Sequence, residues 1–119
     1  MSRMLFTPEA REQARNTLLA IVRADGRVVH REQRSSDDSQ VTLYLGYAHV
    51  ITRYVGRHLH LNVRITHAVG VLYGLRNLDT YWRPEDIGGV WVLKRLAGVH
   101  SLQDLCESLA NILDFARAH

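Results

Sequence analysis

The spacing of apolar residues near the C-terminus is the feature that most constrains the fold of this chain. Within residues 102–116 they recur every three or four positions, which places them on one face of an α-helix. Ser101 and Asp104 approximate a capping box at its start, with Asp where Glu or Gln is usual. This pattern predicts an amphipathic helix whose stripe is Leu102, Leu105, Cys106, Leu109, Ile112, Leu113 and Ala116.

The segment "TPEAREQARNTLLAIVRADG" predicts a second amphipathic helix near the N-terminus. Thr7 is a candidate N-cap, and Pro8 stands at the first helical position, where its missing N–H costs nothing. Asp25-Gly26 is a plausible stop because glycine readily adopts the left-handed conformation. The apolar residues at helical spacing are Ala10, Ala14, Leu18, Ile21 and Val22.

Residues 27–59 allow two interpretations. Val28-Val29 and "VTLYL" (41–45) could pair as two short strands around the polar loop 35–39. Alternatively, Ser39 caps a long helix, and Gly46 and Gly56 weaken it only somewhat. We favour the helix, because alternation stops after residue 45 while helical spacing persists. The residues on that helical face would be Val41, Leu45, Ala48, Ile51, Val55 and Leu59.

Two further helices are expected between these segments. One starts near Asn62 or Thr66 and runs to about Asn77, and the other runs from Pro84 to Gly98. With them, the sequence predicts a mostly α protein: a compact bundle of about five helices, with a short hairpin around residues 27–45 as the alternative. A chain of 119 residues is expected to form one domain, here a single helical domain over residues 1–119.

The histidines in "RHLHLNVRITH" raise the question of a metal site. On a helix, His58 and His60 would lie about 200° apart and could not share a metal. On a strand they would share one face, but a third ligand would have to come from elsewhere, since the segment holds no Asp, Glu or Cys. We therefore predict no metal site, and no cofactor.

No pattern in the chain predicts catalysis. It has no G-x-S-x-G motif and no glycine-rich phosphate loop. Cys106 falls on the apolar stripe of the last predicted helix, which favours a buried, inert thiol over a nucleophile. Glu85 and Asp86 are explained as first-turn charges of a helix that begins at Pro84. We therefore expect no catalytic residues, and a protein that is not an enzyme.

The net charge of +3 is concentrated in the middle of the chain. Residues 39–78 contain four arginines and no acidic residue, and they also hold four of the five tyrosines. Because Tyr, Trp and Arg are enriched at interface hot spots, we expect a regulatory protein that binds a partner protein. The predicted partner-binding residues are Tyr47, Arg53, Tyr54, Arg57, Arg64, Tyr81 and Trp82.

The alternative is a small basic nucleic-acid-binding protein that uses the same arginine-rich middle segment. A helix-turn-helix at residues 92–109 is disfavoured, because its second helix would present Asp104 and Glu107 to phosphate.

We also expect a homodimer. Gly70 and Gly74 lie four residues apart on a predicted helix and leave little side-chain bulk, so a second helix could approach there, beside Tyr73. With one cysteine, no signal peptide and no long apolar run, the expected location is the cytoplasm.

In length, expected helical make-up, arginine-rich composition and lack of a catalytic motif, the chain resembles small proteobacterial anti-activators. These proteins bind a transcription regulator, such as a LuxR-type quorum-sensing receptor, and block its dimerisation or its binding to DNA. The resemblance implies a protein partner that is inhibited, rather than a substrate. It assigns no role to a particular residue.

The expected absence of a metal can be tested directly. Elemental analysis of protein purified without chelators should find no stoichiometric metal. One zinc or iron ion per chain, lost when His58 and His60 are both changed to alanine, would contradict this expectation.

Overall fold

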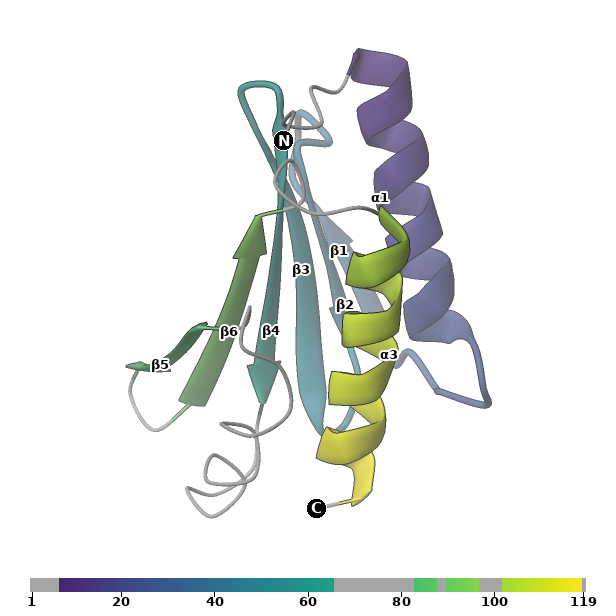
Figure 1. The fold of residues 1–119 in the computed structure, drawn as a ribbon, viewed down its shortest axis with the longest axis vertical. Helices are drawn as coiled ribbons and strands as arrows, with labels where there is room; N and C mark the ends of the chain where they lie inside the picture. The colour runs from purple at the N-terminus through teal and green to yellow at the C-terminus, as the bar shows by residue number, and fades with distance from the viewer. Residues whose placement is uncertain (1–6, 66–82, 88–89, 97–101, 119) are drawn as a thin grey trace.

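The chain folds as a mixed α and β protein and not as a helical bundle (Figure 1). The computed structural model describes residues 7–65 and 102–118 with their side chains, and the backbone of residues 83–87 and 90–96. One antiparallel sheet has the strand order β1-β2-β3-β4-β6-β5. Both described helices lie on the same side of it. The elements are α1 (Pro8–Arg23), β1 (Arg31–Arg34), β2 (Gln40–Tyr44), β3 (Ala48–Val55), β4 (His58–Ile65), β5 (Arg83–Ile87), β6 (Val90–Leu96) and α3 (Leu102–Ala118).

The two amphipathic helices at the ends of the chain are confirmed. The Thr7 hydroxyl accepts a hydrogen bond from the Ala10 N–H at 3.2 Å and so caps α1, with Pro8 in the first turn. After α1 ends, Asp25 and Gly26 both take positive φ angles, 56° and 72°. The stripe predicted for the C-terminal segment is the face that α3 buries, with Leu105, Leu109 and Ile112 each at most 1% exposed; Ser101 lies outside the described residues.

The long helix predicted from Ser39 is wrong. Its residues form β2, β3 and the start of β4, because the alternation of apolar residues does not stop at Leu45 but changes phase at each turn. The inward-facing residues are at odd positions in β2 and β4 and at even positions in β3. Ile51 and Val55, which helical spacing grouped with Val41, therefore lie on the opposite face of the sheet.

The turns that shift the phase are short. Val55 pairs with His58 across a two-residue turn in which Gly56 has a φ of 58°, the left-handed value that a type II′ turn needs at its first central position. The hairpin around residues 27–45, given as the alternative, is present: β1 pairs with β2 across residues 35–39. Its first strand begins at Arg31, two residues after the predicted Val28-Val29.

The helix predicted from Pro84 is also wrong, because β5 and β6 form an antiparallel pair in that region. β5 lies at the edge of the sheet, which is where a proline within a strand is tolerated. Asn62, a predicted helix start, lies within β4. The alternative start, Thr66, and the residues up to Asn77 lie outside the described residues. The helical make-up behind the resemblance to anti-activators is therefore not found.

The hydrophobic core lies between the sheet and the two helices. The inner face of β2–β4 packs against apolar residues of α1, such as Leu18 and Val22, and against the stripe of α3. Neither α1 nor α3, the two helices in the described part of the chain, is long and apolar enough to cross a membrane.

Arg27 joins the two helices at one end of this core. Its side chain is fully buried, and it donates to the carbonyl oxygen of Ile21 at 2.7 Å, at the C-terminal end of α1. It also binds the Asp114 carboxylate of α3 at 2.8 Å. A cation at this position donates hydrogen bonds to the last carbonyl groups of the helix, and it interacts favourably with the negative end of the helix dipole.

Substituting Arg27 should therefore be costly. Arg27→Ala should lower the free energy of unfolding by about 2–4 kcal/mol, because it removes charged hydrogen bonds from a buried position. Asp114→Asn should cost less, since Asp114 is half exposed and water can solvate it. Urea denaturation measures both; equal losses, or no loss for Arg27→Ala, would contradict this role.

Candidate functional site

The outer surface of β1–β4, which faces away from α1 and α3, is the candidate site, and we call it the open sheet face. The strand register shows which residues lie on this face, because alternate residues along each strand point to opposite faces. Its residues are Arg31, Gln33, Gln40, Thr42, Tyr44, His49, Ile51, Arg53, Val55, His58, His60, Asn62 and Arg64.

Strand pairing arranges the cationic groups of this face in two rows that cross the strands. In the first row Arg31 pairs with Tyr44, which pairs with His49, which pairs with Arg64. In the second row Arg53 pairs with His60. Arg53 lies four positions after His49 along β3, so the two rows lie about 13 Å apart.

Within β1–β4, an uncharged middle row lies between the two cationic rows, and the strand register continues it from Asn62 to Lys94 of β6. Gln33 pairs with Thr42, Thr42 with Ile51, and Ile51 with Asn62. Ile51 and Asn62 are half-buried, and Thr42 is 7% exposed. The face thus has a compact centre bordered by positive charge on both sides.

Contacts among its side chains hold the first row in place. The Arg31 guanidinium carbon lies 5.2 Å from the centroid of the Tyr44 ring, and the Tyr44 hydroxyl donates to Gln33 Oε1 at 2.9 Å. The Tyr44 and His49 rings meet edge to face, with centroids 4.6 Å apart. Partial burial, with the Arg64 charge, lowers the pKa of His49, which favours its neutral form at neutral pH.

No carboxylate lies on the open sheet face within β1–β4. The acidic residue of these strands, Glu32, lies on the helix side, where it binds Arg23 of α1 at 2.5 Å and Arg34 at 3.0 Å. The arginines of the open sheet face therefore have no acidic neighbour on the same surface of these strands. Such a surface attracts negatively charged partners.

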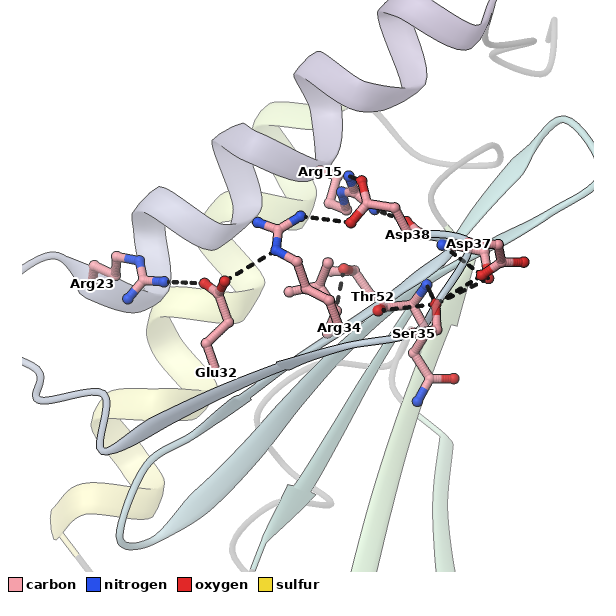
Figure 2. A network of polar contacts seen from close by, with 11 residues as sticks. Arg15, Arg23, Glu32, Arg34, Ser35, Asp37, Asp38 and Thr52 are labelled. Atoms are coloured by element: carbon pink, nitrogen blue, oxygen red, sulfur yellow. Dashed lines mark hydrogen bonds and ion pairs between the residues drawn. The ribbon is translucent and has the colours of Figure 1, made fainter.

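A chain of ion pairs on the helix side attaches β1 and the turn after it to α1 (Figure 2). It continues from Glu32 and Arg34 to Asp38, whose carboxylate binds Arg34 at 2.9 Å and Arg15 of α1 at 2.9 Å. Arg15 is 2% exposed and also donates to the Asp38 carbonyl oxygen at 2.6 Å. These contacts stabilise the hairpin that carries Arg31 and Tyr44.

Tyr54 lies on this helix side and not on the open sheet face. The guanidinium carbons of Arg11 and Arg15 lie 4.0 and 4.4 Å from its ring centroid, and Arg11 also donates to the Gly56 carbonyl oxygen. Burial raises the pKa of the Tyr54 hydroxyl. These groups line an open cleft of about 490 Å³ that also carries Glu12, Asp37 and Asp38, so its mixed charges select no single class of ligand.

The structure brings some of the predicted partner-binding residues together and separates others. Arg53 and Arg64 share the open sheet face, Arg57 lies in the β3–β4 turn, and Tyr54 lies on the other face. Tyr47 lies in the β2–β3 turn and packs against the core. Tyr81, Trp82 and the predicted dimer residues Gly70, Tyr73 and Gly74 lie outside the described residues.

The two histidines of the H-x-H motif are on a strand and share one face, as the strand alternative required. Among the residues that the structure describes, no group of three His, Cys, Asp or Glu side chains could hold a metal ion. Cys106 is a half-buried free thiol whose pKa is raised by burial and by Glu107, which disfavours the reactive thiolate.

Sequence reasoning missed Arg31, Tyr44 and His49 as members of the site, and it considered His60 only as a possible metal ligand. The signal that finds them is the period-two pattern of "HLHLNVRI", where Leu59, Leu61, Val63 and Ile65 alternate without a break. Once that strand is set, the register of its neighbours follows. Comparisons with protein-family models, with curated proteins and with solved structures found no match to this chain.

The β1–β2 turn makes stability depend on pH in the acidic range. Ser39 and Ser35 donate to the Asp37 carboxylate and lower its pKa to about 2, and Arg34 and Arg15 lower the pKa of Asp38. Because both values are depressed on folding, this stabilisation is present above the ordinary value of 3.8 and is lost as the pH falls toward 2.

We therefore expect the free energy of unfolding to decrease from about pH 5 to about pH 2, and the decrease to be smaller in Asp37→Asn. Urea titrations at several pH values test this. Glu9→Gln, at an exposed position in the first turn of α1, is the matched control. An unchanged pH profile in Asp37→Asn would contradict the assignment.

Proposed function

We propose that this protein is a non-enzymatic regulatory protein of the cytoplasm that binds and inhibits an acidic partner protein through the open sheet face. The observation that carries the proposal is that the open sheet face, within β1–β4, carries arginines and no carboxylate. Arg31, Arg53 and Arg64 lie on the face that α1 and α3 leave free, and the carboxylate of Glu32 lies on the covered face. A transcription regulator, which the resemblance implies, is the first partner class to test.

A second copy of the chain is a poor partner for this surface. Two open sheet faces packed against each other would bring three arginines from each copy together, with no carboxylate from β1–β4 to neutralise them. A different protein with an acidic surface avoids this repulsion. The homodimer predicted through Gly70, Tyr73 and Gly74 is a separate prediction, because it concerns another part of the chain.

Nucleic acid is the alternative partner, and the state of Tyr44 argues against it. Proteins that bind single-stranded nucleic acids stack the bases on aromatic side chains that are free to receive them. Tyr44 is the aromatic ring on this face apart from the imidazoles, and it already contacts Arg31, His49 and Gln33. Phosphate contacts from the arginines would remain, and they would give binding that weakens steeply with salt.

A pull-down from lysate, with and without nuclease, distinguishes the two classes. The baits are the unchanged chain, the triple variant Arg31→Ala/Arg53→Ala/Arg64→Ala, and Arg117→Ala as the control. Arg117 is an exposed arginine of α3, in the helix layer. We expect one protein to be retained after nuclease treatment by the unchanged chain and by the control, and to be lost by the triple variant.

Mass spectrometry identifies the retained protein, and a titration of the two purified proteins then measures the stoichiometry and the affinity. The proposal requires saturable binding that weakens only modestly between low and physiological salt, since buried interface contacts are less screened than phosphate contacts. Retention of nucleic acid alone, or retention of the protein by the triple variant, would contradict it.

A further inference from the structure

We propose that the segment of the partner that binds the open sheet face is an amphipathic α-helix, with a narrow apolar stripe and carboxylates along both flanks. This inference rests on the proposed function and specifies the chemistry of the partner. It comes from the arrangement of the two cationic rows on either side of the uncharged middle row. The positions of Arg64 and Arg53 indicate that both flanks of the bound helix are acidic, because these two arginines place positive charge on opposite sides of Ile51.

The dimensions of the face fit one helix. The cationic rows lie about 13 Å apart, and an α-helix with its side chains is about 10–12 Å across. A helix that lies along the middle row would therefore bring the side chains on its two flanks close to the two rows. The first row extends over β1 to β4, about 14 Å, which corresponds to about nine residues of helix.

The middle row determines the stripe of that helix. Ile51 is the apolar residue of the row, and Thr42 and Asn62 flank it on the neighbouring strands. Apolar contact at this centre, with charge at the border, is the usual arrangement of a protein interface. A narrow stripe of small or apolar residues on the bound helix is enough to cover this row, since the side chains of Thr42, Ile51 and Asn62 are already buried or half-buried by their neighbours.

The two flanks of the bound helix contact different residues. One flank faces Arg31 and Arg64, which stand at the two ends of the first row, and the other faces Arg53 and His60. Arginine presents a planar fork that binds a carboxylate with two hydrogen bonds. Carboxylates on one flank alone would leave one row without partners, so both flanks are needed for full affinity.

Three synthetic peptides of about 18 residues, long enough to be helical in isolation, test this inference. The first has an alanine and leucine stripe with glutamate on both flanks, the second has the same composition with all glutamates on one flank, and the third has a scrambled order. Fluorescence anisotropy at physiological salt measures their binding to the full chain. We expect the two-flank peptide to bind at least about tenfold more tightly than the scrambled one, and the one-flank peptide to lie between.

Variants of the chain show whether both rows contribute. Arg53→Ala and Arg64→Ala should each weaken binding of the two-flank peptide by about threefold to tenfold, and Arg117→Ala should leave it unchanged. Far-UV circular dichroism checks that each variant remains folded. In a charge-reversal test, the double variant Arg53→Glu/Arg64→Glu should no longer bind the glutamate peptide, and it should bind a peptide of the same design with lysine on both flanks.

Equal affinity for the two-flank and scrambled peptides would overturn the inference, as would a loss on Arg64→Ala without a loss on Arg53→Ala. Tighter binding of a single-stranded oligonucleotide of equal charge would overturn it in favour of nucleic acid. These outcomes are distinct from failure of the proposed function. If the lysate yields a protein that depends on the open sheet face while the peptides do not bind, the proposed function stands and the helical partner is wrong.

Discussion

The covering of only one sheet face by α1 and α3 is the constraint on which the rest of this structure depends. The inner residues of β2–β4 leave water by packing against apolar residues of α1 and α3, and this requires both helices to stay on that side. Arg27 fixes them to each other, because it binds the end of α1 and Asp114 of α3 at once. The outer face is then left to side chains that neither helix covers.

How much could be predicted from the sequence differs between the ends of the chain and its middle. The helices at both ends were predicted because each keeps one phase of apolar spacing over several turns, with a cap at Thr7 for the first. The strands in the middle of the chain were not predicted, because two turns of two residues each switch the inward-facing residues between odd and even positions. When the strands before and after such a turn are read as one segment, their inward-facing residues fall three or four positions apart, as on a helix. Val41, Leu45 and Ala48 are an example: all three face inward in the sheet.

The candidate site was predicted in part for the same reason. Charge alone identified the basic middle segment and grouped Arg53 with Arg64, which share the open sheet face. It could not separate Tyr54 from Arg53, since neighbours in a strand point to opposite faces. Arg31 was missed because the favoured interpretation had no strand pairing there and the alternative hairpin began at Val28-Val29. Pairing with Tyr44 is what brings Arg31 to the same surface.

The two faces of the hairpin formed by β1 and β2 are physically coupled. Glu32 and Arg34 face α1 and join the ion pairs that end at the buried Arg15, while Arg31 and Gln33 alternate with them and face outward. An edge strand of four exposed residues would have little to hold it by burial alone. The ion pairs on the covered face therefore help to position Arg31 and Tyr44 on the open sheet face, so a change at Asp38 would shift these two residues although Asp38 does not lie on that face.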